Sequence, residues 1–62
     1  MTYLNRLKWA RLERGLSQWH VSRETGIHQS VLSLYERELR QPSEEHKKTL
    51  ARLYGKETED LW

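Results

Sequence analysis

The sequence predicts an all-α fold, a small domain of short helices joined by tight turns. Gly15, Gly26 and Gly55 each follow a stretch that lacks glycine and proline. Glycine directly after such a stretch is the usual C-terminal signal of a helix, because it adopts the left-handed conformation without steric cost. Apolar residues recur at steps of three and four, and no stretch alternates as a half-buried strand does. The pattern therefore predicts four helices and a final short turn.

The first two segments carry clear helix signals. In residues 3 to 14, the residues that share one helical face are Leu4, Leu7, Ala10, Arg11 and Arg14. This spacing predicts an amphipathic helix that ends at Gly15. Ser17 is a favourable N-cap and predicts a second helix over residues 18 to 25, stopped by Gly26.

The remaining segments follow the same rules. Helical spacing of apolar residues predicts a third helix over residues 28 to 37, which must end before Pro42 because the residue preceding a proline is pushed out of the α region. Ser43 predicts the N-cap of a fourth helix, and acidic residues in its first turn favour the helix dipole. Gly55 ends this helix, and Thr58 is the predicted cap of a last turn over residues 59 to 62.

Size and composition favour a binding module over an enzyme. We expect one domain over residues 1 to 62, and a chain of this length buries only about 60% of its unfolded surface, which leaves little room for a catalytic pocket. There is no cysteine, the three histidines lack metal-ligand spacing, and no serine lies in a nucleophile motif. We therefore expect no catalysis, no metal and no other cofactor.

The charge distribution favours an anionic partner for the first part of the chain. Net charge is +2, and residues 1 to 37 hold six Lys and Arg against three acidic residues. No apolar run approaches the ~18 residues of a membrane span, and the N-terminal residues lack the apolar stretch of a signal peptide. We expect a cytoplasmic protein without a membrane partner.

Residues 17 to 36 form a tight helix-turn-helix pattern that carries a resemblance. The run GLSQWHVSRETGIHQSVLSLYER, followed by a loop and a helix beginning Pro-Ser, resembles the Cro/phage-repressor (XRE-like) family of helix-turn-helix transcription regulators. The resemblance covers about residues 4 to 62. It implies a five-helix repressor-like domain whose third helix enters the DNA major groove while the start of the second lies on the sugar-phosphate backbone.

The resemblance also implies roles for single residues. Gln18 matches a phosphate-binding glutamine, and Arg11 and Glu36 match a pair inside the fold. A surface contact is the alternative for this pair, but both residues fall on faces that should turn inward, which favours a partly buried structural role. Residues at the base-reading positions are Gln29, Ser30, Ser33 and Leu34, and those that approach phosphates are Arg37, Arg40 and Gln41. Arg14 is a further phosphate donor by its chemistry. Gln29 is the best base-reading candidate, because one amide bonds both N6 and N7 of adenine.

Three positions depart from the pattern of the family. His28 stands where serine or threonine usually caps the third helix, so either the cap is weak or His28 itself faces DNA. Leu34 replaces a residue that is commonly polar or basic, and its apolar surface suits a thymine methyl. Glu38 replaces a frequent glycine and places an acid near the expected phosphate path.

Several aromatic and apolar residues lie off the predicted inward faces. Trp9, Leu12 and Trp19 either cover the edge of a thin core or form a protein-binding patch. Trp62 is either a lid on the core or an anchor in a partner chain, and Leu61 and Trp62 are the residues expected to mediate dimerisation.

These observations leave two hypotheses for function. The first is a transcription regulator that binds a pseudo-palindromic site in double-stranded DNA as a homodimer, with the helix over residues 28 to 37 in the major groove. The second is a protein-binding module of the same fold, antitoxin-like or anti-repressor-like, with weak or secondary DNA contact. The exposed apolar residues motivate this second hypothesis.

Overall fold

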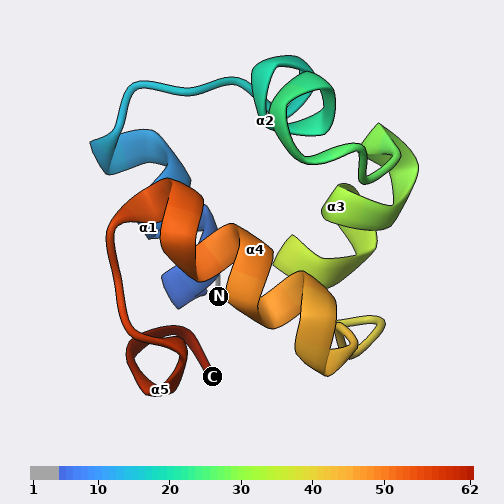
Figure 1. Ribbon diagram of the computed structural model, residues 1–62. Helices are drawn as coiled ribbons and strands as arrows, with labels where there is room; N and C mark the ends of the chain where they lie inside the picture. The colour runs from blue at the N-terminus through green and yellow to red at the C-terminus, as the bar shows by residue number, and fades with distance from the viewer. Residues whose placement is uncertain (1–4) are drawn as a thin grey trace.

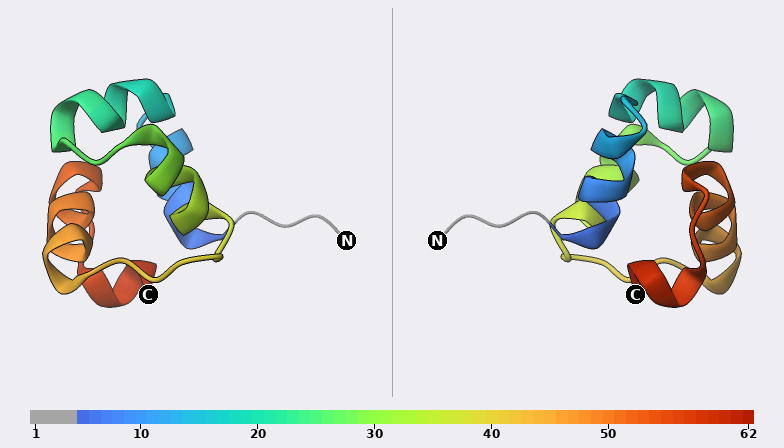
Figure 2. Two further views of the ribbon diagram at one scale, coloured as in Figure 1. Left: turned by 90° about the vertical axis from the view of Figure 1, so that its right-hand side faces the viewer. Right: turned by 90° about the vertical axis from the view of Figure 1, so that its left-hand side faces the viewer.

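The computed structural model describes residues 5–62, and these residues form five α-helices and no strand. The helices are α1 (Arg6–Glu13), α2 (Gln18–Thr25), α3 (Gln29–Glu36), α4 (Glu44–Tyr54) and α5 (Thr58–Leu61). In Figure 1, α2 lies at the top of the molecule, α5 at the bottom and α4 in front. Figure 2 shows α1 and α3 on the side opposite α4. The predicted all-α, five-helix fold is confirmed.

One apolar core joins all five helices. Its buried residues are Leu7, Ala10, Val21, Ile27, Leu32, Tyr35, Leu50, Ala51, Tyr54 and Leu61. Partly buried side chains pack against this core, namely Leu16, Val31, Leu53 and Trp62. None of the helices in residues 5–62 is long and apolar enough to cross a membrane.

An asparagine or serine side chain caps three of the helices by accepting a main-chain N–H. The three bonds run from Lys8 N to Asn5 Oδ1 (2.9 Å), from His20 N to Ser17 Oγ (3.0 Å) and from His46 N to Ser43 Oγ (3.1 Å). Ser17 and Ser43 were expected in this role, whereas Asn5 was not. The Asn5 cap starts α1 at Arg6 rather than at residue 3, and Tyr3 and Leu4 lie outside the described residues.

The turn between α2 and α3 is fixed from both sides. Gly26 has a φ of 77° and ends α2 in the left-handed conformation. Thr25 Oγ1 donates to Val21 O at 2.7 Å and accepts the N–H of Ile27 at 3.2 Å. Ile27 is buried in the core. This turn therefore holds the start of α3 at a set angle to α2.

The last helix begins and ends one residue earlier than the predicted turn over residues 59 to 62. The N–H of Glu57 donates to Asp60 Oδ2 at 3.3 Å, so Glu57 is the N-cap and Thr58 is the first helical residue rather than the cap. Leu61 is only 6% exposed and belongs to the core. The prediction that Leu61 mediates a protein contact is therefore wrong, because the fold already buries its side chain. Trp62 packs against the same core, with Lys47 Nζ 5.9 Å from the centre of its ring.

Candidate nucleic-acid interface

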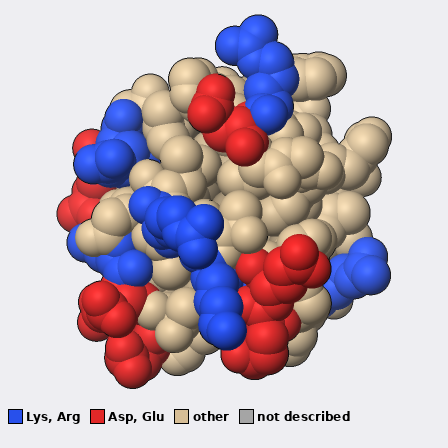
Figure 3. Space-filling model, viewed as in Figure 1, with Lys and Arg blue, Asp and Glu red and all other residues tan. Residues whose placement is uncertain are grey.

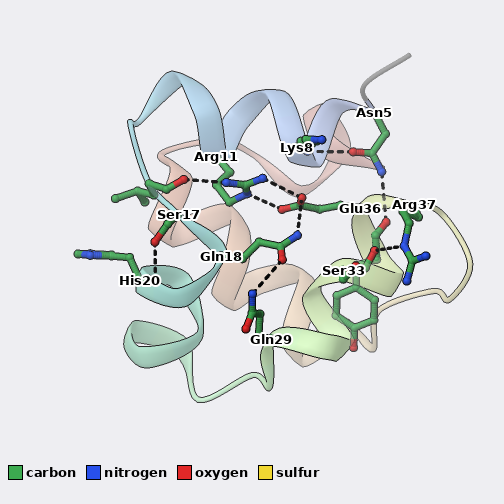
Figure 4. Close-up of polar contacts among 12 residues, drawn as sticks. Asn5, Lys8, Arg11, Ser17, Gln18, His20, Gln29, Ser33, Glu36 and Arg37 are labelled. Atoms are coloured by element: carbon green, nitrogen blue, oxygen red, sulfur yellow. Dashed lines mark hydrogen bonds and ion pairs between the residues drawn. The ribbon is translucent and has the colours of Figure 1, made fainter. Parts of the chain in front are cut away.

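A buried ion pair joins α1 to the end of α3 (Figure 4). Arg11 donates from Nε to Glu36 Oε2 at 2.7 Å and from Nη2 to Glu36 Oε1 at 3.1 Å. Its Nη1 donates to the carbonyl oxygen of Leu16 at 2.8 Å. Arg11 and Glu36 are 8% and 7% exposed, so this two-bond contact lies inside the fold and not on its surface. Such paired geometry offsets part of the cost of removing two charges from water.

Two glutamines extend the ion pair to the start of α3. Gln18 Nε2 donates to Glu36 Oε1 at 3.1 Å, and Gln29 Nε2 donates to Gln18 Oε1 at 3.5 Å. A carboxylate paired with a guanidinium only accepts hydrogen bonds, so it fixes the orientation of the Gln18 amide. Gln18 then turns its oxygen to Gln29. Gln29 directs one amide N–H toward Gln18, and its second N–H and its side-chain carbonyl oxygen remain free for another partner.

The internal bond of Gln18 is a role that the sequence did not reveal. Gln18 was expected to bind a phosphate, and the structure gives one of its two amide hydrogens to Glu36. The second hydrogen and the main-chain N–H at the start of α2 remain available, since the first main-chain donors of a helix have no partner within it. Contact with Glu36 spans 18 residues of sequence, and no local pattern signals it.

The expected base-reading residues occupy the first two turns of α3 and differ in accessibility. His28 and Ser30 are exposed, while Gln29, Ser33 and Leu34 are partly buried. His28 is the N-cap of α3, because its Nδ1 accepts the main-chain N–H of Ser30 at 3.1 Å. The cap expected to be weak is therefore formed.

The expected phosphate-binding residues do not gather at one place. Arg37 ends α3 and donates from Nε to the carbonyl oxygen of Ser33 at 3.4 Å. Arg40 and Gln41 lie in the loop after α3 and line an open hollow together with cationic Lys47. Arg14 lies beside Gly55, at the end of α4. All except Lys47 are exposed.

The comparison with known families decides the identity of this arrangement. A family model described as helix-turn-helix matches residues 7–61. The chain belongs to the helix-turn-helix family of the Cro/phage-repressor type. Members of this family are DNA-binding regulatory domains of the XRE type, and DNA binding is the activity that membership supports. No curated protein and no solved structure gives a significant match.

The loop after α3 of this helix-turn-helix domain contains an acidic residue in an unusual conformation. Glu38 has a φ of 59°, the left-handed region, where a side chain with a Cβ costs about 1–2 kcal/mol. It lines the same hollow as Arg40. The structure thus explains why glycine suits this position.

Basic and acidic side chains are mixed on the face of the helix-turn-helix domain drawn in Figure 3. Acidic groups gather along the lower edge of this face. Among residues 5–62, His, Asp and Glu side chains form no cluster of three that could hold a metal ion.

Large apolar side chains are exposed outside α3. Trp9 is 55% exposed, Trp19 is 68% exposed, and Leu12 is exposed as well. Trp9 lines a hollow together with the core residues Ala10 and Leu61, and a protein-binding patch formed by the three residues stays a prediction. Leu39, in the loop after α3, is exposed as well.

Proposed function

We propose that this helix-turn-helix domain regulates transcription by binding a pseudo-palindromic DNA site as a homodimer, with α3 in the major groove. An α-helix measures about 10–12 Å across with its side chains, so α3 fits the ~12 Å width of that groove. Paired recognition helices about 34 Å apart would place two half-sites one helical turn apart.

The observation that carries this proposal is the position of the Gln29 amide, beside Gln18 at the start of α3. The Arg11 and Glu36 ion pair orients Gln18, and Gln18 orients Gln29. The free carbonyl oxygen of Gln29 matches the N6–H of adenine, and its free N–H matches N7. At 3.5 Å the contact with Gln18 is longer than an ordinary N–H···O bond, so it favours this position of the Gln29 amide without locking it.

Phosphate contacts would set affinity and register around this base contact. The main-chain N–H groups at the start of α2 point out of the helix and favour anions, as helix N-termini do. Arg37 and Arg40 are exposed near the end of α3 and supply cationic donors. We assign Arg14 and Gln41 to the same class. These contacts carry no sequence information and make binding salt-dependent.

Selection of bound duplexes from a random pool tests the proposal. We expect one enriched palindrome whose half-sites are separated by about 10–10.5 base pairs, and two chains bound per duplex in sedimentation. On that duplex, the logarithm of the affinity should fall linearly with the logarithm of salt concentration. No binding to any duplex near ~50 mM salt would contradict the proposal.

The second candidate function is a protein-binding module, antitoxin-like or anti-repressor-like. Exposed Trp9, Leu12 and Trp19 favour it, since such side chains are enriched at interfaces. The double variant Trp9→Ser, Leu12→Ser, with both changes on α1 and outside the proposed DNA contacts, separates the two functions. A regulator that acts through α3 keeps its affinity for the selected duplex in this variant. Weak binding of every duplex by the unmodified chain would favour the protein-binding module.

A further inference from the structure

We propose that His28 has two roles at the start of α3. Its Nδ1 caps the helix, and its Nε2–H donates a hydrogen bond to an acceptor atom of the DNA. This inference rests on the proposed placement of α3 in DNA, and it adds a contact residue whose chemistry follows from the geometry of the cap.

Hydrogen bonds at the cap define where the ring carries its proton. The main-chain N–H of Ser30 lies 3.1 Å from His28 Nδ1. A main-chain N–H only donates, so Nδ1 carries no proton. In neutral imidazole the single ring proton is then on Nε2. The Ser30 hydroxyl lies 2.9 Å from the same Nδ1, and because this nitrogen carries no proton the hydroxyl is the donor and shares the nitrogen lone pair with the main-chain N–H.

The cap therefore decides what each side chain offers to a partner. Nδ1 is turned to the helix start, so Nε2, at the end of the ring farther from the main chain, is turned away from it. His28 is exposed, and no residue within 5–62 accepts a hydrogen bond from Nε2. The Ser30 hydroxyl already donates its hydrogen to His28, so toward a partner it can only accept a hydrogen bond. Neighbouring His28 and Ser30 thus present one donor and one acceptor in fixed positions.

Acceptor atoms of the DNA suit the Nε2–H donor. These are the phosphate oxygens of the backbone and, in the major groove, N7 of either purine, O6 of guanine and O4 of thymine. A serine at this position would accept the helical N–H as His28 does, but it has no ring and therefore no Nε2–H to donate. Histidine at position 28 therefore keeps the cap and adds a contact.

Two substitutions separate the cap from the contact. His28→Ser retains a cap oxygen and removes the Nε2–H, whereas His28→Ala removes both. We expect His28→Ser to match or exceed the unmodified chain in the urea midpoint of unfolding, and to bind the selected duplex about tenfold more weakly. That factor corresponds to about 1.4 kcal/mol, the size of one net hydrogen bond. His28→Ala should show the same loss of affinity and a lower urea midpoint.

The result that overturns the DNA contact is a His28→Ser variant that binds as tightly as the unmodified chain. An unchanged urea midpoint of His28→Ala overturns the cap. Equal weakening on selected and random duplexes identifies a phosphate oxygen as the acceptor. Weakening confined to the selected duplex, with altered preference at one base pair per half-site, identifies a base edge.

Nitrogen-15 NMR of the free chain keeps this inference distinct from the proposed function. We expect the shifts of His28 to show a protonated Nε2 and an unprotonated Nδ1 at neutral pH. Protonated Nδ1 contradicts the cap whether or not the chain binds DNA. If the unmodified chain binds no duplex, the proposed function and the contact of His28 with DNA both fail, while the NMR result still decides the cap.

Discussion

Tyr54 lowers the stability of this small core through its buried hydroxyl group. Its hydroxyl is buried and has no hydrogen-bond partner among residues 5–62. Burial, together with the nearby charge of Glu36, raises the pKa of Tyr54 well above its ordinary value of about 10, while Arg11 opposes the shift. The folded protein therefore holds the Tyr54 proton more tightly than the unfolded chain does.

Replacement of Tyr54 by phenylalanine tests this cost. Below pH ~10 both states are protonated, and Tyr54→Phe should leave the free energy of unfolding unchanged or raise it by about 1 kcal/mol, because an unpaired polar group is removed. Above pH ~10 the unfolded chain ionises Tyr54 first, so the unmodified protein should lose up to about 1.4 kcal/mol per pH unit. Urea unfolding from pH 7 to 11 measures both effects. An identical alkaline slope in Tyr54→Phe would show that other groups cause the loss.

Glu38 carries strain in the backbone and charge in the side chain, and two substitutions separate them. Glu38→Gly should raise the free energy of unfolding by about 1 kcal/mol, because glycine adopts a φ of 59° without a Cβ clash. Glu38→Ala removes the acid and keeps the Cβ, so its stability should stay close to that of the unmodified chain. Both should bind DNA more tightly if Glu38 lies near phosphates. Equal stability of the two variants would contradict the strain.

At the scale of helices, the ends were predictable and the contacts between helices were only partly so. Ser17, Gly26, Ser43 and Gly55 mark helix ends by local chemistry that sequence displays directly. The internal bond of Gln18 to Glu36 joins residues distant in sequence, and only the packing of α2 against α3 reveals it. Helical spacing likewise does not tell how far a five-helix core extends, which is why the exposure of Trp9 and Trp19 could not be predicted.

The loop between α3 and α4 is the element in which a phosphate contact is easiest to isolate. Arg40 is exposed there and forms no ion pair among the described residues. Arg40→Ala should reduce the slope of log affinity against log salt by about 1 and weaken binding equally on all duplexes. Arg52→Ala on α4 is the matched control, with one charge removed outside the proposed interface. A change in base preference for Arg40→Ala would place this arginine on a base edge instead.

For the whole molecule, a domain of 62 residues has little stability to lose. At about 0.05–0.15 kcal/mol per residue, the free energy of unfolding is of the order of 3–9 kcal/mol. The ion pair of Arg11 and Glu36 lies at the centre of the polar network. Its contribution is one part of this small free energy of unfolding. The interior that holds the fold together therefore also orients the residue proposed to read DNA.

Arg11→Met leaves Glu36 as a buried charge without its partner. We expect a loss of about 3–5 kcal/mol, enough to unfold much of the population at 37 °C. The double variant Arg11→Met, Glu36→Leu should be more stable than Arg11→Met, because no buried charge is then left alone. Thermal unfolding by circular dichroism measures both. A double variant less stable than Arg11→Met would mean that Glu36 without Arg11 still stabilises the fold, and would contradict the cost assigned to the unpaired charge.

Base preference of Gln29→Ala tests the central claim of this account most directly. Affinity is measured for the selected duplex and for duplexes changed at each base pair of a half-site, at one salt concentration. We predict that Gln29→Ala loses its preference at a single adenine-containing pair in each half-site, by about 1–3 kcal/mol, and keeps nearly the same affinity for random DNA. Equal weakening on every duplex, or unchanged preference at every pair, would contradict the reading of DNA by Gln29.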